Sequence, residues 1–269
     1  MSTTVLGSSA AIALSASDID EGTTRMTCPV CNAQDEQSLV VTRQGALVKY
    51  ICHRASCGAR GVTSDRSPMV RAKRRAPKAP KIFTNPLASL SERERKLLKD
   101  RIGFNAWHLG VANPMLDEST NRIAFPIYGP MGMRRGWLLR SYDYSAHGPK
   151  ALTRMDVSDE PHLAWYRVNP SSSRVIVVED IPSAVRASRH LPQAVAMLGA
   201  GIGPDYVNEI CQFARHIVWA FDADATVQAF EHHRKYSNFF ESSQVLPLKR
   251  DLKDMDEHEL SDTIRPVSL

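Results

Sequence analysis

Four cysteines near the start of the chain stand in two close pairs. Their spacings are C-x2-C and C-x4-C, with twenty residues between the pairs, at Cys28, Cys31, Cys52 and Cys57. Two thiolate pairs that a hairpin brings together form a tetrahedral four-sulfur site, which is the usual site of a structural zinc ion. The spacing therefore predicts one bound Zn²⁺.

The segment between the pairs indicates how they meet. SLVVT and LVKYIC are typical of two strands, and Gln44-Gly45 is typical of the turn between them. The segment is too short to bury a core, so metal binding is expected to drive its folding as a zinc ribbon. Two alternatives stay open: His53 replaces one cysteine as ligand, or the four thiols hold no metal. The fifth cysteine, Cys211, falls in a helical segment and is interpreted as core packing.

A second group of reactive side chains follows an apolar run. HIVWAF is followed at once by Asp222 and Asp224. Two carboxylates one residue apart repel each other unless a cation lies between them. The alternative is that an aspartate caps the helix that begins there.

The elements around these aspartates favour the metal site. Strands and helices alternate, which predicts a parallel sheet with helices on both faces. The carboxyl ends of such strands form the ligand-binding edge. Acidic residues follow three of the strands, at Glu179, at Asp222 and Asp224, and at Asp251, beside a turn that contains Gly199, Gly201 and Gly203. Hard oxygen ligands in this arrangement predict a Mg²⁺ or Mn²⁺ site. The expected strands are 174–178, 194–198, 216–221 and 243–248, and the expected helices are 182–190, 204–214 and 224–237.

Composition limits the class of protein. The chain has 269 residues, 43% hydrophobic residues and a net charge of +5. No apolar run approaches the roughly 20 residues of a membrane span, and the polar beginning lacks the basic region of a signal peptide. The chain has five cysteines, an odd number, and four of them are clustered, which favours an intracellular protein that uses thiolates for metal.

The predicted fold class is α/β, with a small β zinc module, an α+β basic subdomain and a parallel sheet. A helix is expected over 91–101 with a serine cap, and two arginine-bearing strands around a Gly-Pro turn over 121–143. The predicted segments are a disordered leader (1–25), the zinc ribbon (26–63), a basic Pro-rich linker (64–86), a basic subdomain (87–171), and the parallel-sheet domain with a C-terminal tail (172–269).

Four motifs carry a resemblance to a known family. VIVVEDIPSAVRA, AMLGAGIG, VWAFDADATVQA and LKRDLKDM resemble the TOPRIM fold shared by bacterial-type primases and topoisomerases, over residues 172–256. RIAFPIYGPMG, GWLLR and PKALTRMD resemble the basic half of a primase polymerase core. With the zinc ribbon and linker in front, the order resembles that of a bacteriophage DNA primase over residues 26–256. TOPRIM proteins often have glycine after the glutamate and an acid four positions later, where this chain has Asp180 and Ser183.

The resemblance implies an enzyme that makes short RNA primers on single-stranded DNA from ribonucleoside triphosphates during phage replication. It implies that Glu179, Asp222, Asp224 and Asp251 hold Mg²⁺ or Mn²⁺, with Glu179 as ligand or as base. Lys150 resembles the lysine of a primase "PK" motif. Cationic side chains are expected to bind nucleotide or DNA: Lys150, Arg122 and Arg140 in the core, Arg43, Lys49 and Arg54 beside the zinc, and Arg74 and Arg75 in the linker.

The expected setting is the cytoplasm of an infected bacterial host, without a membrane. No P-loop motif occurs in the chain, so a partner replicative helicase is expected to be a separate polypeptide. Two other classes of function stay open. One is a TOPRIM nuclease or topoisomerase-like enzyme, and the other is a non-catalytic DNA-binding module.

Overall fold

The computed structural model describes most of the chain. The described residues are 19–32, 37–45, 47–54, 56–57, 59–64, 91–117, 120–141, 149–156, 161–167, 172–199 and 201–268. The first 18 residues of the predicted leader and residues 65–86 of the predicted linker, which include Arg74 and Arg75, lie outside them.

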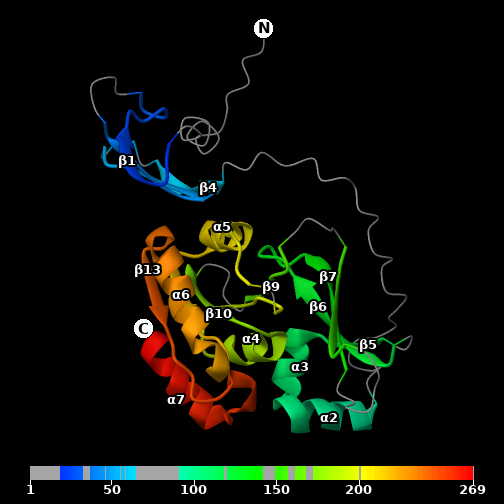
Figure 1. Ribbon diagram of the computed structural model, residues 1–269. Helices are drawn as coiled ribbons and strands as arrows, with labels where there is room; N and C mark the ends of the chain where they lie inside the picture. The colour runs from blue at the N-terminus through cyan, green and yellow to red at the C-terminus, as the bar shows by residue number, and fades with distance from the viewer. Residues whose placement is uncertain are drawn as a thin grey trace. The chain divides into compact units, whose positions relative to one another are not determined.

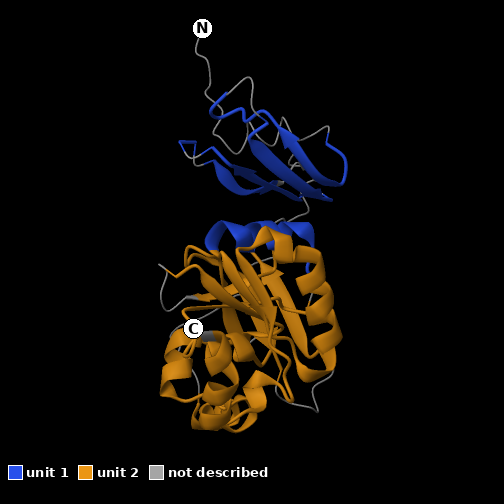
Figure 2. Cartoon of the chain, turned by 90° about the vertical axis from the view of Figure 1, so that its left-hand side faces the viewer, with its two compact units in different colours: residues 1–72, 202–213 blue, residues 73–201, 214–269 orange. Residues whose placement is uncertain are grey.

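The chain divides into two compact units (Figure 2). Unit 1 comprises residues 1–72 and 202–213, and unit 2 comprises residues 73–201 and 214–269. Unit 1 therefore includes a segment, 202–213, that the sequence analysis assigned to the parallel-sheet domain. Each unit has a hydrophobic core cluster of its own.

Unit 1 contains an antiparallel sheet in the order β1-β2-β3-β4 (Figure 1). The two predicted strands are present as β2 and β3. The turn between them begins at Gly45, whose φ of 59° favours glycine. The four strands are β1 (Gly22–Met26), β2 (Leu39–Gln44), β3 (Leu47–Cys52) and β4 (Arg60–Ser64).

The predicted end of the leader is wrong. Residues 22–25 were assigned to a disordered segment, but they form most of β1, which pairs with β2. The hydroxyl oxygens of Thr23 and Thr42 lie 3.1 Å apart across this pair. The β-branched threonines suit a strand, and pairing covers the edge of β2 that would otherwise be open. The helix α5 (Pro204–Phe213) packs against β4 in the same unit.

The described part of unit 2 begins with two helices, followed by an antiparallel sheet in the order β5-β6-β7-β8. The predicted serine cap is present, because Ser91 and Glu94 form a reciprocal capping box. The two predicted arginine-bearing strands are β6 and β7. The elements are α2 (Glu92–Ile102), α3 (Ala106–Ala112), β5 (Met115–Asp117), β6 (Arg122–Tyr128), β7 (Arg134–Arg140) and β8 (Ala151–Met155).

The second sheet of unit 2 has the order β13-β12-β10-β11-β9. Its first four strands are parallel, as predicted, and β9 is an antiparallel edge strand. The elements are β9 (Ala164–Arg167), β10 (Arg174–Val178), α4 (Ile181–Ala187), β11 (Gln193–Ala196), β12 (His216–Trp219), η1 (Ala223–Ala225), α6 (Thr226–Tyr236), η2 (Ser237–Phe239), β13 (Ser242–Val245), η3 (Leu252–Asp254) and α7 (Glu257–Ser268).

Helices cover the two faces of this sheet. Ile176, Val178 and Val218 lie in the core cluster that contains residues of α4 and α7. Because side chains alternate along a strand, Trp219 points to the opposite face. There its ring lies 5.9 Å from that of His232 on α6. The fold is a mixed α/β fold, and α7 lies in the segment that the sequence analysis described only as a tail.

Candidate functional site

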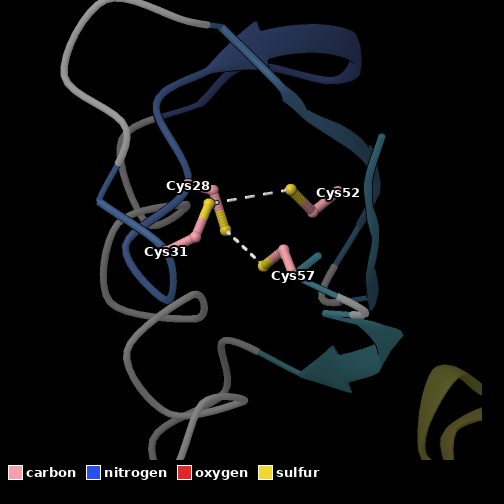
Figure 3. A group of neighbouring side chains, drawn as sticks. All are labelled: Cys28, Cys31, Cys52 and Cys57. Atoms are coloured by element: carbon pink, nitrogen blue, oxygen red, sulfur yellow. Dashed lines mark hydrogen bonds between the residues drawn. The ribbon is translucent and has the colours of Figure 1, made fainter. Parts of the chain in front are cut away.

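The four predicted zinc ligands converge in unit 1 (Figure 3). Their Sγ atoms all lie within 4.8 Å of one another. Sγ of Cys28 is 3.7 Å from that of Cys57, and Sγ of Cys31 is 4.0 Å from that of Cys52. A tetrahedral zinc ion with Zn–S bonds of about 2.3 Å holds its sulfurs about 3.8 Å apart. The four thiols therefore fit one zinc ion.

Local backbone structure places the two pairs. The amide of Asn32 donates to the carbonyl oxygen of Cys28 (2.8 Å), which closes the turn between the first two cysteines. Cys52 ends β3, and its amide donates to the carbonyl oxygen of Ala59 (2.7 Å). Although burial raises the pKa of Cys52, hydrogen bonding to Ser38 and to the backbone of Arg54 lowers it to about 7. A lower pKa favours the thiolate, which is the form of cysteine that binds a metal.

His53 is not part of the cysteine cluster. Its side chain is exposed, and its amide donates to the carbonyl oxygen of Ser38 (2.8 Å). The geometry favours a four-cysteine site over the histidine alternative.

The cationic residues predicted beside the zinc differ in their surroundings. Arg43 on β2 donates to the carbonyl oxygens of Ile19 (3.0 Å) and Gly45 (3.3 Å), so it ties the start of the described chain to the β2–β3 turn. Lys49 on β3 is half-buried, and Arg54 is exposed. Contact of these residues with nucleic acid stays a prediction.

Carboxylates gather at the carboxyl edge of the parallel sheet in unit 2. The Glu179 side chain, just after β10, accepts a hydrogen bond from the amide of Asp222 (3.2 Å). The Asp251 side chain accepts one from the amide of Ala223 (3.3 Å). The backbone that follows β12 therefore holds the acids from the neighbouring segments in place.

A lysine lies at the centre of this group. Nζ of Lys253, in η3, is 2.8 Å from Oδ2 of Asp222 and 2.6 Å from Oδ2 of Asp251. It is also 3.4 Å from Oδ2 of Asp180. We call Asp180, Asp222, Asp251 and Lys253 the acidic cluster. Among the described residues, only the cysteines form a group of three or more potential metal ligands within 4.8 Å of one another.

The pKa values in the acidic cluster follow from burial and from Lys253. Burial raises the pKa of Asp222 to about 7, against the opposing effect of Lys253. Burial also acts to raise the pKa values of Asp180 and Asp251, but both are lowered, because Lys253 acts together with Arg140 and the amide of Ser183 on Asp180 and together with the amide of Ala223 on Asp251. Burial raises the pKa of Glu179. Two cations, Lys253 and Arg140, thus face the four carboxylates of Glu179, Asp180, Asp222 and Asp251, and the site carries excess negative charge.

Arg140 is one of the predicted nucleotide-binding residues. It ends β7, and its Nη1 lies 3.2 Å from Oδ2 of Asp180. Arg122 is buried on β6, where its Nη1 donates to the carbonyl oxygen of Lys150 (3.3 Å). The Lys150 side chain itself is exposed. The structure therefore gives both arginines partners within the protein and leaves Lys150 at the surface.

The helix-cap alternative for Asp222 is not supported. Asp222 precedes η1, but its side chain makes no capping hydrogen bond. Asp180 is the residue that caps a helix, because its Oδ1 accepts from the amide of Ser183 (2.9 Å) at the start of α4. Asp224, in η1, is exposed.

The glycine-containing turn lies beside Glu179. Leu198 and Gly199 both have positive φ, of 56° and 78°. Leucine adopts such a backbone at a cost, and conformations of this kind concentrate at functional sites. The amide of Leu198 donates to the carbonyl oxygen of Glu179 (2.9 Å), so the turn fixes the backbone of the predicted catalytic glutamate.

Two residues of this site were not predicted from the sequence: Lys253, and Arg186, which holds the backbone of Lys253. Arg186 on α4 is buried, and its Nη1 donates to the carbonyl oxygen of Lys253 (3.0 Å). The available signal was the segment DLKDMD, in which one lysine stands among three acids, shortly after the predicted strand 243–248. Arg186 gave no such signal, because only the packing of α4 brings it to η3.

Unit 2 also contains a pocket of about 460 Å³ between α3, β9 and the β6–β7 turn. Its aromatic lining residues are Trp107, Tyr128, Trp165 and Tyr166. None of the predicted site residues that the structure describes lines it, so the pocket and the acidic cluster are separate features.

In the described part of the chain, no helix combines the length and apolar character needed to cross a membrane.

The comparisons with known proteins bear on the fold. No family model and no curated protein matches the sequence. The RNA polymerase domain of Mycobacterium tuberculosis primase DnaG is similar in structure, with a TM-score of 0.54 and 15% identity, over 68% of this chain and 78% of that one. A structure of the Aquifex aeolicus primase, comprising its zinc-binding and RNA polymerase domains, has a TM-score of 0.51 and 12% identity, over 95% of this chain and 81% of that one. At these identities the similarity is one of fold.

Proposed function

We propose that the chain is a DNA primase of the bacterial type, which synthesises short RNA primers on single-stranded DNA by metal-dependent nucleotidyl transfer. The observation that carries this proposal is the convergence of Glu179, Asp222 and Asp251 at the carboxyl edge of the parallel sheet. The fold shared with primase RNA polymerase domains supports it.

In the proposed reaction, the 3′-hydroxyl of a ribonucleotide attacks the α-phosphorus of an incoming nucleoside triphosphate. A new P–O bond forms, the bond to the β-phosphate oxygen breaks, and pyrophosphate leaves. Glu179 is the candidate to accept the hydroxyl proton, because burial raises its pKa and a stronger base accepts that proton more readily. If Glu179 instead holds a metal ion, the proton passes to solvent.

The carboxylates suit a divalent ion, because their oxygens already surround one positive charge, the ammonium group of Lys253. The residues that would hold Mg²⁺ or Mn²⁺ are Glu179, Asp222, Asp224 and Asp251. A metal bound there would offset the negative charge of the triphosphate.

Lys150 is the proposed triphosphate contact, since its side chain is exposed. Arg122 is proposed to position Lys150, because its guanidinium donates a hydrogen bond to the carbonyl oxygen of Lys150. Arg140 has a similar positioning role, because it pairs with the residue that caps α4. In the zinc ribbon, Lys49 and Arg54 are proposed to contact the template.

The finer parts of the proposal rest on sequence resemblance. They are the TOPRIM character of the parallel sheet, the bacteriophage setting in an infected bacterium, and a replicative helicase as partner.

One observation favours a second candidate. Because Lys253 already offsets charge in the acidic cluster, the cluster could be stable without metal, as in a non-catalytic DNA-binding module. The experiment is ribonucleotide incorporation on a set of short single-stranded templates with Mg²⁺ or Mn²⁺, with the products sized on a gel. Short RNA products support the primase, cleaved template indicates a nuclease, and template binding without either product indicates the binding module.

A further inference from the structure

Lys253 occupies the position where a cation is most favourable. Its ammonium nitrogen lies within 3.4 Å of three carboxylate oxygens, and its side chain is 15% exposed. Two of these oxygens belong to Asp222 and Asp251, the residues that the proposed function assigns to metal binding. One positive charge thus already sits between two proposed metal ligands.

We propose that Lys253 is a built-in counter-ion that competes with the divalent cation: it holds the carboxylates together in the metal-free protein and must move aside when the ion binds. This inference rests on the proposed function and adds that Lys253 regulates metal affinity at the same site.

Electrostatics gives the direction of the effect. Like charges in close contact repel each other, and the repulsion is stronger in a partly buried site than in water. A lysine that stays in the acidic cluster therefore repels an incoming divalent ion strongly. A lysine that leaves the cluster gives up its ion pairs with Asp180, Asp222 and Asp251. In either case the lysine lowers the apparent affinity for the metal.

The structure lets the side chain move while the backbone stays. Arg186 holds the carbonyl oxygen of Lys253 (3.0 Å), and Glu257 lies 3.6 Å from the same guanidinium. Beyond this anchor, lysine has four methylene groups and an ammonium group that can bond in several directions. The same flexibility would bring the ammonium group to a triphosphate once the ion has replaced it.

The test is direct measurement of Mn²⁺ binding by calorimetry and by the electron paramagnetic resonance signal of free Mn²⁺, without nucleotide. Lys253→Met removes the charge and keeps most of the length, and we expect its Kd for Mn²⁺ to fall at least about tenfold, equal to about 1.4 kcal/mol. Lys253→Arg keeps the charge and should bind Mn²⁺ within about threefold of the wild-type protein. Lys249→Met, at an exposed lysine four residues away, is the matched control and should leave the Kd unchanged.

Thermal stability supplies a second readout. In a chelator, the Lys253→Met variant should melt below the wild-type protein, because Asp222 and Asp251 lose their shared partner. Saturating Mn²⁺ should then raise its melting temperature more than that of the wild-type protein. If the methionine variant does not fold, Lys253→Gln serves for the same comparison.

Two results would overturn the inference in distinguishable ways. Equal Mn²⁺ affinity in the wild-type protein and Lys253→Met, or weaker affinity in the variant, rejects competition and leaves the proposed function intact. No Mn²⁺ binding by either protein rejects the metal site itself, and the inference fails with it.

Discussion

His108 is fully buried on α3, where an imidazolium would have no access to water. Its Nδ1 accepts a hydrogen bond from the amide of Asn105 (3.1 Å), and its ring stacks on that of Phe104. Burial lowers the pKa of His108 to about 4, although Glu257 partly opposes the shift. Arg186, Arg189 and His190 surround the same glutamate and reinforce the lowering.

We therefore expect the stability of unit 2 to depend on His108 between about pH 6.5 and pH 4. The unfolded chain binds a proton at this residue below about pH 6.5, while the folded protein does so only near pH 4. The contribution is thus fully present above pH 6.5 and falls as pH drops, by up to about 3 kcal/mol. The measurement is the free energy of unfolding against pH. In His108→Gln this part of the pH dependence should disappear, and an unchanged profile would show that His108 is not its source.

At the scale of residues, the sequence predicted sites whose geometry is local and missed partners that come from distant segments. The cysteine spacing was sufficient to predict the thiol cluster, because each pair lies within one turn. The carboxylates at strand ends were predictable because parallel strands share an edge. The pairing of Arg140 with Asp180 was not predictable, since it joins residues 40 positions apart, one at the end of β7 and the other at the start of α4.

Gly136 shows what the β7–β8 pair requires. A Cβ built on Gly136 would collide with the carbonyl oxygen of Arg154 and lie 2.8 Å from Cα of Met155. Both are backbone atoms of β8, so no side-chain rotation relieves the contact. The glycine therefore allows the two strands to approach closely.

Gly136→Ala should destabilise unit 2 by about 1–3 kcal/mol, the usual cost of overpacking. Gly110→Ala is the control, because Gly110 lies in α3 with nothing within 4 Å of the added Cβ. Alanine there should stabilise the helix by up to about 1 kcal/mol. Chemical denaturation measures both changes, and equal effects in the two variants would contradict this account of Gly136.

At the scale of elements, the alternation of strands and helices predicted the parallel sheet and the order in which its strands and helices follow one another along the chain. The predicted ends of the strands were less accurate, because apolar residues continue beyond the last residue that pairs with a neighbouring strand. The third strand was expected to reach residue 221, but β12 ends at Trp219. The following residues, Ala220 and Phe221, are buried and carry the chain to Asp222. β1 was missed because its sequence has no apolar alternation and gains its order from pairing with β2.

At the scale of the whole molecule, each of the two units has a hydrophobic core cluster of its own. The core of unit 1 includes Cys28 and Cys52, so its packing is coupled to the state of the thiols, whereas the core of unit 2 contains no cysteine among its described residues. Removal of zinc by a chelator should therefore unfold β1–β4 and leave the parallel sheet folded. Limited proteolysis and calorimetry with and without chelator measure this. Cys28→Ser should behave like the chelated protein, and Cys211→Ser should keep its zinc. A single cooperative loss of both sheets would contradict the prediction.

The basic linker stays a prediction, because its residues 65–86 lie outside the described residues. Replacing Arg74, Arg75 and Lys78 with serine should reduce the salt dependence of single-strand binding, by about 0.7 in log–log slope for each phosphate that the linker no longer neutralises. Binding isotherms over a range of salt concentrations measure the slope. An unchanged slope would show that the linker does not bind nucleic acid.

The central claim is that the carboxylates of Glu179, Asp222, Asp224 and Asp251 hold the metal ions for nucleotidyl transfer. Its most direct test is ribonucleotide incorporation on a single-stranded template by Asp222→Asn, compared with Asp262→Asn at an exposed position on α7. Asparagine keeps the shape of Asp222 but removes the charge that a divalent ion requires. Incorporation should fall at least about a hundredfold, equal to about 2.7 kcal/mol, while template binding and the Asp262→Asn control stay at the wild-type level. Wild-type incorporation by Asp222→Asn would contradict the account.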